Sequence, residues 1–255
     1  MPAGVINKTM DRADLDTVGA RAIVDELNGL IRELKDRGLR ISSWYGCFDL
    51  SGDRGERINR GYGYRPLDDA ADDALFPWFL YWQIVWVVLH GGFSRQQRIL
   101  DLGGSSSLFS YYLAARGYDV TTIDLQQELV DNGNLVARRM GWNLRNHRMD
   151  IRNLCFSTRF DHITSICVFE HIPLWERVEV NRNIGLLLND SGRFSITFDY
   201  RNPSRFSRID SPDDVQEQFV TTSGMKIRGT RFLSIRAGII CSIPFILSPL
   251  VICIN

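Results

Sequence analysis

The first regular hydrophobic pattern of the chain runs from Asp16 to Arg37. Apolar residues recur there every three or four positions, the spacing of one helix face, at Val18, Ile23, Leu27, Leu30, Ile31 and Leu34. Gly38 follows where a C-cap glycine belongs. The pattern predicts an amphipathic helix. Residues 41–65 are rich in glycine, arginine and aromatic residues and predict turns and a loop.

The most apolar run in the first half of the chain spans Ala74 to Leu89. Trp78, Trp82 and Trp86 are spaced four residues apart, so one helical face carries three indoles. The run predicts a buried helix packed on a sheet. The alternative is a face for a partner or a second copy of the chain, because exposed aromatic stripes mark interfaces. A membrane span needs about 20 apolar residues, and this run is shorter.

Strand and helix patterns then alternate. Strand-like runs occupy residues 98–102, 118–124, 162–168 and 193–198, and helical patterns separate them. Strands connected through helices imply right-handed crossovers and a parallel sheet. We therefore expect an α/β fold of the doubly wound, mostly parallel kind.

The first of these strands ends in the run Asp101-Leu102-Gly103-Gly104-Ser105-Ser106-Ser107. Ligands of doubly wound sheets bind outside the carboxyl ends of strands, and glycine allows a sharp turn and a close approach to the ligand. The second strand ends in Asp124, whose carboxylate could accept hydrogen bonds from both hydroxyls of a ribose. The two features predict a nucleoside-containing cofactor. The alternative is an ordinary βαβ unit with an aspartate at the surface and no role in binding.

A dinucleotide is disfavoured because a pyrophosphate needs the pattern G-x-G-x-x-G, and serines stand where its later glycines would be. The stretch from Ile99 to Tyr200 instead resembles the core of class I S-adenosylmethionine (SAM) dependent methyltransferases. Their first motif, D-x-G-x-G-x-G, is matched at Asp101 and Gly103. Ser105 and Ser107 stand where the motif has its later glycines, and serine restricts φ more than glycine does.

The resemblance implies a set of cofactor residues. It assigns the ribose to Asp124, the adenine amino group to Asp150 and the adenine ring to Ile151. The full set that we expect to line the cofactor is Asp101, Gly103, Gly104, Ser105, Asp124, Leu125, Asp150, Ile151 and Val168.

The resemblance also implies a seven-stranded sheet, with a helical and loop extension over residues 1–92 that covers the active site and a SAM-binding core over residues 93–255. Its last two strands would lie in the C-terminal third. The uncharged tail from Ala237 to Ile254 has three interpretations: the last strand of the sheet, a membrane-associated tail or an abnormal C-terminus. We favour the strand, although Pro244 and Pro249 argue against a central one.

The sequence gives weaker signals for the catalytic residues and for those that contact the acceptor. The run Glu170-His171-Ile172 after the fourth strand resembles that of many small-molecule methyltransferases, and a histidine has a suitable pKa for a general base. The alternative is that Glu170 and His171 cap a helix or line the pocket. We expect the acceptor beside Phe169 and beside three residues of the loop that precedes the core, Tyr62, Tyr64 and Arg65.

Composition narrows the choice of function. Lys plus Arg and Asp plus Glu both total 30, so the net charge gives no support for nucleic acid as a partner. Five scattered cysteines without a Cys-x-x-Cys predict no metal site and favour a reducing, cytoplasmic setting. The sequence predicts a SAM-dependent methyltransferase that acts on a small-molecule or glycan-type acceptor. The alternatives are a non-catalytic SAM-fold scaffold and an enzyme that methylates protein or RNA.

Overall fold

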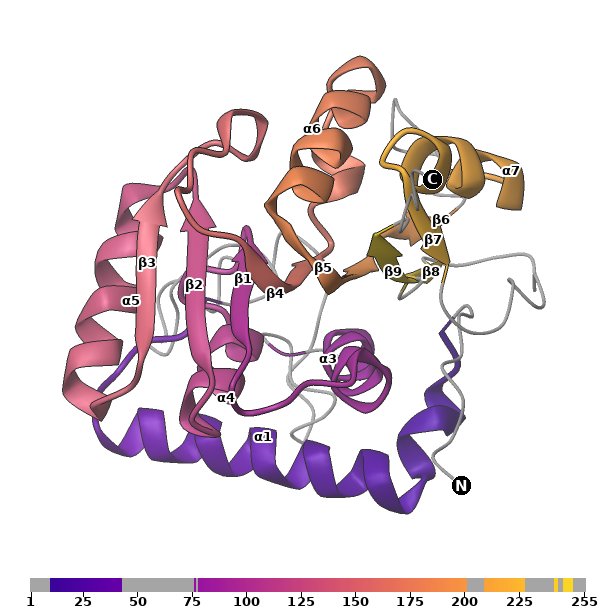
Figure 1. The fold of residues 1–255 in the computed structure, drawn as a ribbon. Helices are drawn as coiled ribbons and strands as arrows, with labels where there is room; N and C mark the ends of the chain where they lie inside the picture. The colour runs from indigo at the N-terminus through magenta and orange to yellow at the C-terminus, as the bar shows by residue number, and fades with distance from the viewer. Residues whose placement is uncertain are drawn as a thin grey trace.

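The computed structural model describes residues 10–42, 76, 78–200, 209–227, 241–242 and 245–249. Its centre is a sheet whose strands β3, β2, β1, β4 and β5 lie side by side and run parallel (Figure 1). Their bounds are β1 Arg98–Leu102, β2 Asp119–Asp124, β3 Leu144–Arg148, β4 Phe160–Ile166 and β5 Leu188–Thr197. The predicted α/β class with a parallel sheet is confirmed.

Two antiparallel strands extend this sheet beyond β5. Strand β9 (Phe245–Pro249) pairs with β5, and β7 (Met225–Ile227) pairs with β9, so the order is β3-β2-β1-β4-β5-β9-β7. A separate two-stranded ladder joins β6 (Asp199–Tyr200) to β8 (Cys241–Ser242). The tail thus contributes a strand between two others. Pro249 is the last residue of β9, where the absence of an N–H disturbs the ladder least.

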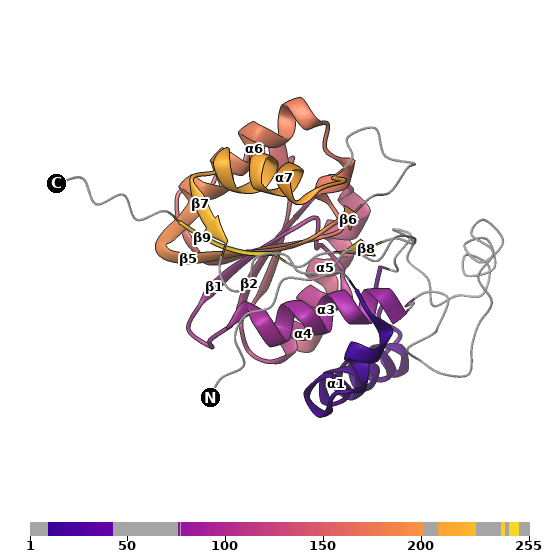
Figure 2. The ribbon, with the colours of Figure 1, turned by 90° about the vertical axis from the view of Figure 1, so that its right-hand side faces the viewer.

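Helices cover both faces of the sheet (Figure 2). One face carries α3 (Trp78–Gly91) and α4 (Leu108–Ala115), with α1 (Val18–Asp36) outside them, and α5 (Gln127–Met140) joins the same hydrophobic cluster. The other face carries α6 (Leu174–Leu187) and α7 (Pro212–Val215). Short helical turns occur at η1 (Arg12–Asp16), η3 (Ile151–Asn153), η4 (Phe169–His171) and η5 (Gln216–Thr221).

Helix α1 forms where the hydrophobic spacing predicts it. Thr17 is its N-cap and accepts a hydrogen bond from the N–H of Ala20. The buried side is made of Ala20, Ile23, Leu27, Leu30, Ile31 and Leu34. These side chains pack into the same cluster as α3, α4 and one face of the sheet. The described part of the N-terminal segment therefore shares a core with the sheet.

Helix α3 is buried, as its apolar composition predicts. Trp82 is fully buried, and its ring stacks on Trp86 with centroids 4.9 Å apart. The Trp82 indole N–H donates to Asp14 in η1 at 2.8 Å. Trp78 is only half-buried, so the three indoles do not form one exposed face. None of the described helices is both long and apolar enough to cross a membrane.

Two strand boundaries differ from the sequence expectation. The predicted strand over residues 162–168 begins at Phe160 and ends at Ile166, because Cys167 leaves the extended conformation with φ +53°. Strand β5 begins at Leu188, five residues before the predicted start, and its pairing with β4 shifts register between Phe160 and His162. Periodicity does not reveal such an irregularity, since it depends on the neighbouring strand.

Candidate cofactor and acceptor site

The ends of four parallel strands meet at one edge of the sheet. Leu102 of β1 is paired with Ile123 of β2 on one side and with Ser165 of β4 on the other. Thr197, the last residue of β5, is paired with Ile166 of β4. The segments after these strands therefore begin at the same level, which is where a doubly wound sheet binds its ligand.

The turn after β1 depends on its two glycines. Gly103 has φ +72° and donates its N–H to the Ile123 carbonyl at 2.9 Å. A Cβ on Gly103 would lie 2.7 Å from Cγ2 of Val168, and one on Gly104 would lie 1.9 Å from Oδ2 of Asp101. Gly103 is exposed, so the turn leaves its backbone open to a ligand.

The serines of this turn differ from the expectation. Restricted φ was expected to matter at Ser105 and Ser107, but the left-handed residue is Ser106, with φ +64°. Ser107 has φ −77° and is the N-cap of α4, where its hydroxyl accepts from the N–H of Ser110 at 3.1 Å. The hydroxyl of Ser105 is 2.8 Å from that of Thr122 in β2. Serine therefore fits at both positions where this sequence differs from the glycines of the motif.

Asp101 is buried inside the turn. Its carboxylate accepts hydrogen bonds from Ser110 in α4 at 2.6 Å and from Thr164 in β4 at 2.8 Å. Burial raises the pKa of Asp101 to about 6, and the two hydrogen bonds oppose that shift. The side chain thereby ties β1, α4 and β4 together beneath the glycines.

Asp124 ends β2 and is only half-buried. Its carboxylate accepts from the N–H of Gln126 at 3.0 Å, and burial raises its pKa. The main-chain carbonyl of Asp124 also accepts from Met149 at 3.0 Å, which brings the segment after β3 to the same edge. Leu125, the next residue, is 59% exposed, so apolar surface stands open beside the carboxylate.

Asp150 and Ile151 follow β3 at this edge. Asp150 is the N-cap of η3 and forms an ion pair with Arg152, whose hydrogen bond lowers the pKa of the Asp150 carboxyl. Arg152 also reaches Glu176 of α6 at 3.3 Å. Ile151 is half-buried. The structure thus brings the predicted cofactor residues from β1, β2, β3 and β4 to one edge.

The turn after β4 separates two neighbouring residues. Glu170 is buried, whereas His171 is exposed. The ring of Phe169 is fully buried and packs on Phe194 and Phe219, so it belongs to the core and does not line an open site. This differs from its expected place beside the acceptor. Tyr62, Tyr64 and Arg65 lie outside the described residues.

A polar cluster that sequence reasoning missed lies at the ends of β4 and β5. Ligand atoms of Cys167, Glu170 and Asp199 all lie within 4.8 Å of one another, and the three could hold a metal ion. The Cys167 thiol and the Thr197 hydroxyl both donate to the side-chain carbonyl of Gln83 in α3 at 2.9 Å. Two signals could have found it: an acid directly after the fifth strand, and a glutamine inside an apolar helix.

Arg177 of α6 lies near this cluster. It is fully buried, donates to the carbonyl of Ile172 at 2.8 Å and bonds to the Gln218 side chain. Burial lowers its pKa to about 10, and the charge of Glu170 opposes that shift. Arg177 thus places a buried guanidinium near the Glu170 carboxylate.

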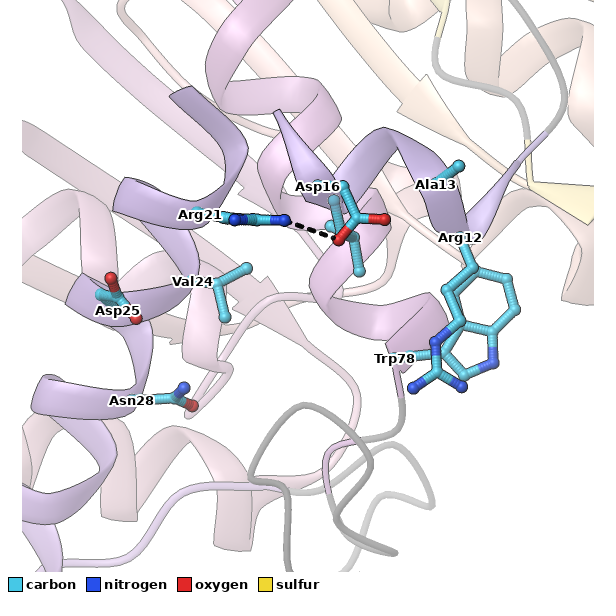
Figure 3. A pocket seen from close by; sticks show the side chains of 9 residues that line it. Arg12, Ala13, Asp16, Arg21, Val24, Asp25, Asn28 and Trp78 are labelled. Carbon is cyan, nitrogen blue, oxygen red and sulfur yellow. Dashed lines mark hydrogen bonds and ion pairs between the residues drawn. The ribbon is translucent and has the colours of Figure 1, made fainter. Parts of the chain in front are cut away.

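A separate pocket of about 510 Å³ lies between η1, the start of α1 and the start of α3 (Figure 3). Its lining carries both signs of charge, including the Arg21–Asp16 pair at 3.3 Å, and the half-buried Trp78. It contains none of the residues assigned to the cofactor or acceptor.

Comparison with known proteins identifies the fold. A family model described as a methyltransferase domain matches residues 99–192. Residues 99–192 are therefore similar to a methyltransferase domain, and the chain has the fold of SAM-dependent methyltransferases. The domain includes β1 to β4, α4 to α6 and the glycine turn. Predictions of the family and of its cofactor are therefore confirmed.

Named relatives match part of this chain over part of their own length. The ubiquinone biosynthesis O-methyltransferase of Aeromonas salmonicida is 30% identical over 123 residues, which are 48% of this chain and 51% of that protein. The chain thus spans about half the length of the curated relatives it matches.

Two solved structures show the same fold. One is a SAM-dependent methyltransferase from Clostridium acetobutylicum, with a TM-score of 0.54 and 13% identity, which covers 66% of this chain and 89% of that one. The other is the PH0226 protein of Pyrococcus horikoshii, with a TM-score of 0.54 and 16% identity, which covers 76% and 98%. Similarity at this level concerns the methyltransferase fold alone.

Proposed function

We propose that this protein transfers a methyl group from SAM to a small-molecule acceptor at the carboxyl edge of its sheet. The observation that carries the proposal is the exposed glycine turn after β1 beside the half-buried Asp124 after β2. A backbone open at Gly103 and a carboxylate next to it suit a nucleoside with two ribose hydroxyls. A Cβ at Gly103 would lie 2.7 Å from Cγ2 of Val168, so the packing of Val168 on the turn requires glycine at this position.

The cofactor residues have distinct roles in this proposal. Asp124 holds the ribose, while Leu125 and Ile151 provide apolar surface for the adenine ring. Asp150 accepts from the adenine amino group, and Val168 lies against the glycine turn. Asp101 holds the shape of the turn from inside, because its carboxylate accepts hydrogen bonds from Ser110 and Thr164. When bound, SAM supplies an electrophilic methyl group.

The acceptor end is proposed at the cluster of Glu170, Asp199 and Cys167, in which both carboxylates are buried and Cys167 is half-buried. Val168, next in the chain to Cys167, approaches Gly103, so this cluster lies beside the cofactor turn. Either carboxylate would accept the proton that a hydroxyl acceptor loses on methylation, and the methyl–sulfur bond of SAM would break to leave S-adenosylhomocysteine. A hydroxylated small molecule, including a glycan-type one, is therefore the preferred acceptor. The named O-methyltransferase relatives favour oxygen as the methylated atom.

The test is methyl transfer from isotope-labelled SAM to a library of hydroxylated small molecules, measured for wild type, Glu170→Gln and Asp199→Asn. Loss of a positioned base lowers turnover by about 10²- to 10⁴-fold, and the variants should keep their SAM affinity. Glu217→Gln, an exposed carboxylate in η5, is the control. SAM binding without transfer to any compound would instead favour the scaffold interpretation.

A further inference from the structure

Asn132 of α5 connects the glycine turn to the segment that follows α1. Its side-chain Nδ2 lies within hydrogen-bond distance of three oxygens: the main-chain carbonyl of Arg40 at 3.0 Å, the hydroxyl of Ser106 at 2.9 Å and the hydroxyl of Tyr111 at 3.1 Å. These residues belong to three separate parts of the chain, so Asn132 is the point where they meet.

The segment at residues 40–42 also binds the turn directly. The main-chain N–H of Ser42 donates to the carbonyl of Ser106 at 2.8 Å, and the Ser42 hydroxyl reaches the same oxygen at 3.2 Å. The Tyr111 hydroxyl lies 3.4 Å from the Arg40 carbonyl. The N-terminal segment and the cofactor turn are therefore joined through both main chain and side chains.

Ser106 is the residue of the turn that needs this support. It is fully buried and has φ +64°, a conformation that is unfavourable for a residue with a side chain. Its hydroxyl donates to the Leu129 carbonyl at 2.7 Å while it accepts from Asn132. Such a conformation persists only when surrounding contacts fix it.

We propose that Asn132 is a positioning residue for SAM. It holds the left-handed turn at Ser106 in the shape the cofactor requires and couples that turn to residues 40–42. The inference rests on the proposed binding of SAM at this turn. It gives the N-terminal segment a role in cofactor affinity, although Asn132 is not expected to touch SAM.

Asn134 offers a matched control on the same helix. It is also a half-buried asparagine with three hydrogen bonds, all to Asn146 in β3: two at 3.0 Å and one at 3.3 Å. Asn134 ties α5 to the sheet without contacting the turn. Replacing either asparagine by leucine removes three hydrogen bonds from one helix. Asn132→Leu loses direct bonds to Ser106, Arg40 and Tyr111, whereas Asn134 reaches the turn only indirectly, through Asn146, Thr122 and Ser105.

The experiment is calorimetric titration of the full chain with SAM, together with thermal unfolding, for wild type, Asn132→Leu, Asn132→Asp and Asn134→Leu. We expect the two Asn132 variants to bind SAM about tenfold more weakly, because a turn that must be reordered on binding reduces the apparent affinity. Asn134→Leu should lose stability and keep its SAM affinity within about twofold of wild type.

Hydrogen exchange adds a readout that a purely structural role would not change. Coupling is reciprocal, so SAM should protect the Ser42 amide in wild type and much less in Asn132→Asp. Wild-type SAM affinity in both Asn132 variants, or equal weakening in Asn134→Leu, would overturn the inference alone. A wild-type protein that binds no SAM would overturn the proposed function as well, and the titration distinguishes the two failures.

Discussion

Asp101 and Asp124 end neighbouring strands, yet their carboxylates have different environments. Asp101 is buried under the glycine turn and bonded to Ser110 and Thr164, whereas Asp124 is half-buried at the open edge. The sequence motif assigns both to the cofactor. Only the structure separates a residue that shapes the turn from one that can face a ligand, because Thr164 comes from a strand 63 residues away.

Asp124→Ala should weaken SAM binding by about one to two decades, since hydrogen bonds to a charged group contribute roughly 1.5–3 kcal/mol. Calorimetric titration measures the change. Asp119→Ala is the control, because Asp119 begins the same strand and pairs with Arg145. Unchanged affinity in Asp124→Ala would show that the ribose is not held at this residue.

The pKa of Asp101 predicts a pH dependence of stability. Burial raises it from 3.8 to about 6, so between these values the folded protein binds more protons than the unfolded chain. Stability from this group is therefore present at low pH and is lost as pH rises from about 4 to about 6, by up to about 3 kcal/mol. The Asp101→Asn variant should not show this loss of stability.

Chemical denaturation of wild type and Asp101→Asn at pH 4 and pH 7 tests this linkage. The free energy of unfolding of the variant minus that of wild type should be larger at pH 7 than at pH 4, because only wild type loses stability over this range. A difference that does not change with pH would mean that the Asp101 carboxyl titrates alike in the folded and unfolded states.

Gly103→Ala should reduce both stability and SAM affinity. The substitution puts a Cβ at φ +72° and 2.7 Å from Val168. Gly117→Ala has a similar backbone cost, about 1–2 kcal/mol, because Gly117 has φ +84° but nothing within 4 Å of the new Cβ. The control should bind SAM normally. Equal SAM affinity in the two variants would argue against ligand approach at Gly103.

At the scale of elements, periodicity predicts most helices and strands. Helix α1 follows from apolar spacing on one face, whereas β1 and β2 follow from short apolar or β-branched runs, since both faces of these strands are buried. The irregular elements are less predictable. The early start of β5 and the end of β4 depend on their mutual register and on the positive φ of Cys167, which no local pattern encodes.

Helix α4 begins at a serine that the family comparison treats as a substituted glycine. Because Ser107 is its N-cap, Ser107→Ala should lower the unfolding free energy by about 1 kcal/mol, and Ser107→Gly by only a few tenths. Urea denaturation measures both. If glycine costs as much as alanine, the hydroxyl has a further role, and SAM titration of the same variants would show whether that role is ligand contact.

At the scale of the whole molecule, the sheet brings together residues that are far apart in sequence. The cofactor edge could be predicted because carboxyl ends of parallel strands coincide. The sequence signals the cluster of Cys167, Glu170 and Asp199 only through Gln83 and Asp199, and it does not signal the contacts of Asn132. Both depend on how α3, α5 and residues 40–42 pack on that sheet. Side-chain networks of this kind join elements whose relative position periodicity leaves undefined.

The most direct test of the central claim is a crystal structure of the protein with S-adenosylhomocysteine, the product that remains after methyl transfer. The account predicts the ribose hydroxyls on the Asp124 carboxylate, the Gly103 turn against the ligand and the sulfur facing the side of Glu170 and Asp199. A ligand bound elsewhere, or a sulfur enclosed by packed side chains with no path from Asp199, would contradict it.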